Sequence, residues 1–223
     1  MAEALDLARR AVQDGITRSV LTSHVHPHRY PNQRSNLEGA VTEFAAALAH
    51  AGIELQVRMG GEARLCPELI DLVADHQVPF LGEVNGFKIL LLEFPHQMIP
   101  VGSIRFITSL LRMKIRPLIA HPERNKAIMT QVDKVREFTD AGCWLQLTAG
   151  SLVGRFGEQA ETAAYALIDA GHTCLAATDA HNLSSRPPLL SEARNALSAR
   201  YGEAVATTMT HDRPAQIWGT ATA

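Results

Sequence analysis

The sequence predicts an α/β fold in which parallel strands alternate with helices. Two stretches, KILLLE (88–93) and RPLIA (116–120), are almost continuously apolar, as strands are when helices cover both faces of a parallel sheet. Segments with helical periodicity separate such stretches along the chain. No Ser/Gly linker, charge block or low-complexity tract interrupts residues 1–223, so we expect a single domain. A closed or partly closed (β/α) barrel suits this number of units.

The expected elements follow from local patterns. An apolar stripe predicts a first helix over residues 3–14, which Gly15 ends. Ser35 and Glu38 have the spacing of a capping box and predict the start of a second helix, which ends near Gly52. Strands are expected over residues 17–24, 53–62, 88–95, 115–121, 143–151 and 172–181. Further helices are expected over residues 67–75, 131–141, 157–170 and 188–200.

Composition excludes several classes of protein. The formal charge of -2 over 223 residues gives no basic excess, so we expect no nucleic-acid surface. No apolar segment has the length of a membrane span, and no signal peptide follows Met1. The cysteines, Cys66, Cys143 and Cys174, are odd in number and widely spaced, as in a reduced intracellular protein. We therefore expect a cytoplasmic protein without membrane insertion.

Side chains able to bind a metal stand at the ends of five expected strands. These residues are His24, Glu62, Glu93, His121 and Asp179, with His181 two positions further on. In a (β/α) barrel, reactive groups from different strands gather at the carboxyl ends of the strands. A single histidine at such a position is more often structural, but the repetition at equivalent positions predicts a metal site. Mixed nitrogen and oxygen ligands suit Mn, Fe or Zn, and the crowded carboxylates would repel one another without cations.

Longer motifs surround these residues across nearly the whole chain. In order, they are QDGITRSVLTSHVHPHRYPN, GGEARL, LLLEFP, LIAHPERN, LQLTAGSLVGRFG and ATDAHNLSSRPP. With these motifs, the sequence resembles the bacterial PHP-type tyrosine-protein phosphatases of capsular and exopolysaccharide synthesis, within the polymerase and histidinol phosphatase superfamily. The resemblance implies a distorted (β/α)7-type PHP barrel that holds two to three metal ions, Mn²⁺ in preference to Fe or Zn.

The resemblance also implies a role for each side chain. Arg124 and Arg186 match arginines that grip the phosphate of the substrate. The implied reaction is in-line attack on phosphorus by hydroxide that the metals generate from water. The implied metal ligands are Glu62 between two metals, Asp179 on the first metal, Glu93 and His121 on the second, and His24 and His181 on the third.

One part of the family pattern has no counterpart in this sequence. Family members begin with a strand that carries an Asp-x-His-x-His motif, whereas this sequence begins at the first helix. We therefore expect a barrel whose first strand is missing and whose first metal keeps only Glu62 and Asp179. The unpaired barrel wall would favour pairing with another chain, so an oligomer is compatible with the sequence. A start codon placed too far downstream in the gene would explain the difference.

The leading hypothesis for function is phosphotyrosine hydrolysis, with a tyrosine autokinase of polysaccharide synthesis as the partner that the resemblance implies. A histidinol-phosphatase type of small-molecule phosphomonoesterase is one alternative. A catalytically impaired protein that binds phosphotyrosine or the kinase is another.

Three side chains near the expected site are open to two interpretations. Arg29 and Tyr30 follow the strand that ends at His24, so they either touch the substrate or belong to a solvated loop. Glu123 either orients His121 or pairs with Arg124.

Overall fold

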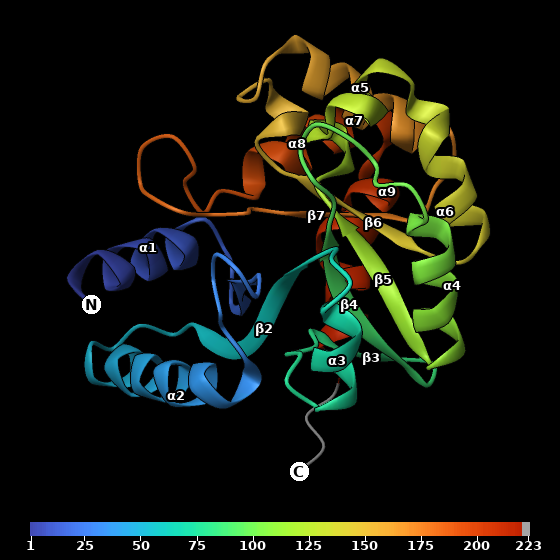
Figure 1. Ribbon diagram of the computed structural model, residues 1–223. Coiled ribbons are helices and arrows are strands. Elements are labelled where there is room, and N and C mark those ends of the chain that lie inside the picture. The colour runs from blue at the N-terminus through green and yellow to red at the C-terminus, as the bar shows by residue number, and fades with distance from the viewer. Residues whose placement is uncertain (220–223) are drawn as a thin grey trace.

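A curled, mostly parallel sheet runs through the centre of the computed structural model, which describes residues 1–219 (Figure 1). Its strands are β1 (Arg18–Val25), β2 (Gln56–Arg64), β3 (Gly82–Val84), β4 (Phe87–Glu93), β5 (Ile115–Ala120), β6 (Trp144–Thr148) and β7 (Cys174–Ala177). The order is β1-β2-β4-β5-β6-β7, with neighbours parallel, and β3 pairs antiparallel with β4. Within the described residues, β1 and β7 are the edges of the sheet and do not pair with each other.

Helices surround this sheet. They are α1 (Ala2–Gln13), α2 (Arg34–His50), α3 (Leu69–Ala74), α4 (Ser103–Arg112), α5 (Lys126–Thr130), α6 (Arg136–Asp140), α7 (Glu158–Asp169), α8 (Ser191–Tyr201), α9 (Glu203–Thr207) and α10 (Arg213–Trp218). Figure 1 shows α1 and α2 beside β2, and α4 and α6 on the side of β5. None of the helices in residues 1–219 is both long and apolar enough to cross a membrane.

The two faces of the sheet pack into different hydrophobic clusters. On the outer face, Leu90 and Leu92 of β4 pack among helical residues such as Ile107. On the inner face, the alternating residue Leu91 packs with a smaller cluster that includes Ile217 of α10. A Cβ atom on Gly82 would lie 1.8 Å from the carbonyl oxygen of Ile217, so only glycine permits this close approach. The inner cluster forms the floor below the carboxyl ends of the strands.

Two local predictions need correction. Helix α2 does not begin with a capping box at Ser35, because Asn36 Oδ1 accepts a hydrogen bond from the backbone N–H of Gln33 at 2.9 Å, and the helix starts at Arg34. Strand β3 was not expected from the sequence. It forms a hairpin with β4 through Asn85 and Gly86, whose φ angles are 52° and 76°.

Candidate metal centre

The register of the parallel strands brings three predicted ligands to one face. His24 of β1 lies opposite Glu62 of β2, so their side chains point to the same side of the sheet. Glu62 in turn lies opposite Leu91 of β4, two residues before Glu93, which therefore shares that side. The strands end within two residues of these positions, so the three side chains meet at the carboxyl edge, above the inner cluster.

Distances within this group are short. One ligand atom from each of His24, Glu62 and Glu93 lies within 4.8 Å of the others. His121, which follows β5, places its Nε2 atom 2.9 Å from Oε1 of Glu62 and 3.9 Å from Oε1 of Glu93. Glu62 and Glu93 are only 4% and 7% exposed. The structure therefore gathers four of the predicted ligands into one largely buried cluster.

The loops that follow β5 and β7 bend sharply at the predicted ligands. His121 and Asp179 have φ angles of 33° and 49°, in the left-handed region that side chains other than glycine rarely adopt. After His121, the turn Pro122–Arg124 closes with a 2.9 Å hydrogen bond from the Arg124 N–H to the His121 carbonyl. Such strained residues often occur at functional sites, where the surrounding structure enforces the conformation.

Each carboxylate of the cluster has a basic side chain beside it. Burial alone would lower the pKa of His121, but the hydrogen bond and negative charge of Glu62 outweigh burial, so its pKa is raised. On the other side of the group, Arg64 donates a 2.9 Å hydrogen bond to Oε2 of Glu93. Two buried carboxylates and two imidazoles with converging atoms form a donor set that fits a divalent ion such as Mn, Fe or Zn.

Asp179 lies between the two predicted phosphate-binding arginines. Its Oδ2 atom accepts hydrogen bonds from Arg124, at 2.6 Å, and from Arg186. Its Oδ1 atom lies 3.8 Å from Nδ1 of His181, whose ring centroid is 6.1 Å from that of His24. The structure thus places Asp179 and His181 beside the four-residue cluster, and their role as metal ligands stays a prediction.

Three contacts at the site were not foreseen from the sequence. The ring of His96 stacks on that of His121 with centroids 5.7 Å apart, and its Nε2 lies 3.7 Å from Oε1 of Glu93. The Arg124 guanidinium lies 4.3 Å from the centroid of Phe156, within range of a cation–π contact. The position of His96, three residues after Glu93 in the sequence, was the available signal for its contact with Glu93.

Both interpretations of Glu123 are wrong. Its Oε1 atom accepts hydrogen bonds from the N–H of Thr148 at 3.0 Å and from Oγ of Ser151 at 2.8 Å. Its other oxygen has no hydrogen-bond partner among residues 1–219, and the side chain is fully buried. Burial raises the pKa of this carboxyl group. Glu123 therefore fixes the segment after β6 instead of holding His121 or Arg124.

The thiols are protonated at neutral pH. Burial raises the pKa of both Cys143 and Cys174 to about 12, and that of Cys66 to about 11 with a contribution from a hydrogen bond to Glu68. A nucleophilic cysteine requires the opposite shift, toward the thiolate. The described cysteines are therefore poorly suited to attack phosphorus.

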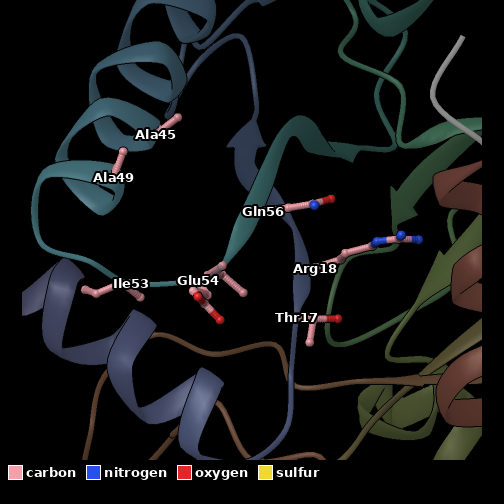
Figure 2. Close-up of a pocket in the computed structure, with 8 residues that line it drawn as sticks. Thr17, Arg18, Ala45, Ala49, Ile53, Glu54 and Gln56 are labelled. Carbon is pink, nitrogen blue, oxygen red and sulfur yellow. The ribbon is translucent and has the colours of Figure 1, made fainter. Parts of the chain in front are cut away.

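A separate hollow of about 520 Å³ lies at the amino ends of β1 and β2. Helix α2 contributes Ala45 and Ala49, and the loop before β2 contributes Glu54 (Figure 2). Arg18 and Glu54 are the charged side chains of its lining. Because it opens at the amino ends, it is distinct from the metal-ligand cluster at the carboxyl ends.

Comparisons with known proteins agree with this architecture. The family described as capsular polysaccharide synthesis, CpsB/CapC, matches residues 1–218. Tyrosine-protein phosphatase YwqE of Bacillus subtilis (strain 168) is 31% identical over 201 residues, which span 90% of this chain and 78% of the relative. Tyrosine-protein phosphatase CpsB of Streptococcus pneumoniae is 25% identical over 224 residues, which span 96% and 89% of the two chains.

A solved structure supports the same relationship. It comes from work on YwqE from Bacillus subtilis and CpsB from Streptococcus pneumoniae, described there as metal-dependent tyrosine phosphatases. The TM-score is 0.90 at 28% identity, and the match covers 97% of this chain and 86% of the other. The predicted α/β fold is confirmed, as is the resemblance to capsular tyrosine phosphatases. The chain therefore belongs to the CpsB/CapC family of capsular polysaccharide synthesis.

Proposed function

We propose that this chain is a metal-dependent protein-tyrosine phosphatase. The observation that carries the proposal is the convergence of His24, Glu62, Glu93 and His121 at the carboxyl edge of the sheet, with two arginines beside them. A mixed cluster of imidazoles and carboxylates binds cations, and guanidinium groups bind phosphate oxygens. Names of the relatives, which are tyrosine-protein phosphatases, support the same activity.

The metal that we propose is Mn²⁺, with Fe or Zn as alternatives, in a site for two to three ions. Glu62 and Glu93 would hold it together with His121 and His24, and Asp179 and His181 would add ligands at the edge of the cluster. When bound, such ions polarise phosphoryl oxygens and make hydroxide available from water near neutral pH. The 2.9 Å distance between Nε2 of His121 and Oε1 of Glu62 supports this assignment. Once His121 is deprotonated, both atoms have a free lone pair, so one ion could bind them together.

The arginines are proposed to orient the phosphoryl group. Arg124 and Arg186 both point at one oxygen of Asp179, so their N–H donors already converge on a small region. A phosphoryl oxygen near this region would accept hydrogen bonds from both guanidinium groups. Their positive charge would stabilise the negative charge that develops on this oxygen in the transition state. The ring of Phe156, with its centroid 4.3 Å from the Arg124 guanidinium, limits the freedom of that donor.

The net reaction converts phosphotyrosine and water into tyrosine and inorganic phosphate. The bond between phosphorus and the phenolic oxygen breaks, and the electron pair leaves with that oxygen. Because a phenolate is a comparatively good leaving group, the site needs no strong general acid. The reaction therefore demands what the described residues offer, which is cation ligands and phosphate-binding donors.

We further propose that the substrate is a phosphotyrosine-bearing protein, namely a bacterial tyrosine autokinase of polysaccharide synthesis, and that the reaction takes place in the cytoplasm. The capsular polysaccharide synthesis family supports this choice of partner. Phosphorylation of the kinase followed by treatment with the protein tests it, because loss of phosphotyrosine from the kinase is the expected result.

A substrate comparison tests the proposed activity. Protein stripped with a chelator and reloaded with Mn²⁺ is given a phosphotyrosyl peptide, a phosphoseryl peptide of the same sequence, or histidinol phosphate, and phosphate release is measured. The proposal expects fastest turnover of the phosphotyrosyl peptide. Preference for histidinol phosphate would show a small-molecule phosphomonoesterase. Binding of the phosphotyrosyl peptide without phosphate release under any divalent metal would show a binding protein instead.

A further inference from the structure

An exposed aromatic ring lies directly beside the metal-ligand cluster. Tyr30 stacks on His24 with ring centroids 5.2 Å apart and an interplanar angle of 25°. The Nδ1 atom of His24 is in turn 3.9 Å from Oε2 of Glu62. Tyr30 is nevertheless 41% exposed. One neighbour of this ring is therefore a predicted ligand, and much of the rest of its surface is open to solvent.

The backbone fixes the position of this ring. Tyr30 N–H donates to the His26 carbonyl at 2.7 Å, and His26 N–H donates back to the Tyr30 carbonyl at 2.9 Å. The side chain of Asn32 donates a 2.9 Å hydrogen bond to the carbonyl oxygen of His24. These bonds close a short loop onto the end of β1, so little conformational entropy would be lost when a ligand contacts the ring.

The two other aromatic rings at the site, Phe156 and His96, have different surroundings from Tyr30. The Arg124 guanidinium occupies a face of Phe156 at 4.3 Å. His96 stacks on His121, and its Nε2 faces the Glu93 carboxylate at 3.7 Å, so it acts as a polar neighbour of the cluster. Tyr30 meets only the exposed Arg29, at 5.4 Å, besides His24 among the ring contacts of the described residues. His96 is 54% exposed but presents an imidazole, so Tyr30 is the exposed carbocyclic ring beside the cluster.

We infer that Tyr30 is the platform against which the phenyl ring of phosphotyrosine packs, an inference that rests on the proposed function. The phenyl ring is joined to phosphorus through a single oxygen, so a phosphate held at the metal-ligand cluster keeps that ring within a few ångströms of the cluster. Tyr30 lies beside the cluster, against His24. His24 in turn neighbours His181, whose N–H bonds the carbonyl of Arg186 at 2.9 Å. The platform and the phosphate-binding loop are therefore linked through the neighbouring rings of His24 and His181, and aromatic stacking favours aryl over alkyl phosphates.

The test compares aromatic with non-aromatic substrates. With Mn²⁺-loaded protein, kcat/KM is measured for a phosphotyrosyl peptide and for acetyl phosphate, which has a good leaving group but no ring. Tyr30→Ala is expected to lower the ratio of the two values about 3- to 10-fold, the range of one aromatic contact. Tyr30→Phe should keep the ratio within about 2-fold, because the stacking surface remains. Met113→Ala, which removes another exposed apolar side chain (47% exposed), is the matched control and should leave the ratio unchanged.

An unchanged ratio in Tyr30→Ala would overturn the inference. If both kcat/KM values fall by the same factor, Tyr30 only positions His24, and if neither falls, Tyr30 has no role in turnover. Binding of a peptide with non-hydrolysable phosphonomethyl-phenylalanine, measured against methylphosphonate by calorimetry, gives a second readout that needs no turnover. If wild-type protein releases no phosphate, the proposed function fails, while the binding ratio of Tyr30→Ala to wild type still decides the role of Tyr30.

Discussion

The Nε2 atom of His121 lies 2.9 Å from Oε1 of Glu62, and both side chains are almost fully buried. The two residues are 59 positions apart and come from β2 and from the end of β5. A second carboxylate, that of Glu93, lies 3.9 Å from the same nitrogen. Arg64 already pairs with Glu93, whereas Glu62 faces only imidazoles among the described residues, and a divalent ion between the two carboxylates would supply more positive charge than one protonated imidazole. This pair therefore anchors the proposed metal centre.

Removing the charge of Glu62 should weaken metal binding. Glu62→Gln keeps the shape of the side chain but replaces a strong oxygen ligand by an amide. We expect Mn²⁺ affinity to fall by more than about 100-fold, beyond the effect of losing a residue that only supports a ligand. Calorimetric titration with Mn²⁺ measures the change. Glu43→Gln, on the exposed side of α2, is the matched control, and equal affinity in the two variants would contradict the role of Glu62.

Replacing either arginine by lysine should lower kcat/KM for the substrate more than it lowers the affinity for Mn²⁺. Arg124→Lys or Arg186→Lys keeps a positive charge but loses the planar fork that meets Asp179. We expect kcat/KM for a phosphotyrosyl peptide to fall about 100-fold, as when one transition-state donor is removed. Mn²⁺ affinity should change little. Arg112→Lys, exposed at the end of α4, provides the control, and unchanged kcat/KM in the first two variants would refute the assignment.

Gly82 should tolerate no side chain. A Cβ atom there would meet the Ile217 carbonyl oxygen at 1.8 Å, so Gly82→Ala must displace α10 from the inner cluster. We expect the free energy of unfolding to fall by about 3 kcal/mol, at the upper end for overpacking. Denaturant unfolding measures this.

Gly39→Ala is the matched control for that change. Gly39 is an exposed residue of α2, and an added Cβ would meet no heavy atom of the described residues within 4 Å. The substitution should raise the free energy of unfolding by about 0.5–1 kcal/mol, because alanine favours the helix over glycine. A larger loss of stability at Gly39 than at Gly82 would refute the packing of α10 against β3.

The thiols should be dispensable for turnover. With a pKa of about 12, Cys143 and Cys174 are about one part in a thousand thiolate at pH 9, and less at lower pH. Alkylation by iodoacetamide should therefore stay slow from pH 7 to 9, and phosphate release should survive it. Cys66→Ala, at the thiol with a pKa of about 11, should also retain activity. Rapid inactivation that tracks modification of a single cysteine would contradict a mechanism without a thiol.

Much of the fold was predictable because it depends on local patterns. The apolar runs of β4 and β5 match strands buried on both faces, and both strands lie inside the sheet. His24, Glu62, Glu93 and His121 converge because the carboxyl ends of neighbouring parallel strands share one edge. Asn85 and Gly86 form the Asn-Gly pair typical of a two-residue hairpin, so the sequence also contains a signal for β3.

The rest depends on contacts between distant segments. The packing of Ile217 of α10 against the inner face of the sheet leaves no pattern in the sequence around it. Likewise, Asp179 and Arg124 are 55 residues apart, and the sequence alone does not indicate that their side chains form an ion pair. Glu123 had two plausible partners nearby, yet its hydrogen bonds go to Thr148 and Ser151, which the fold brings over it.

The measurement that tests the central claim most directly is phosphate release from a phosphotyrosyl peptide while Mn²⁺ is titrated into chelator-treated protein, for wild type beside His121→Ala. The metal-centre account predicts no release before Mn²⁺ is added, saturable recovery in wild type, and little recovery in the variant. Release that persists after chelation in wild type, or equal recovery in His121→Ala, would contradict the proposed metal centre.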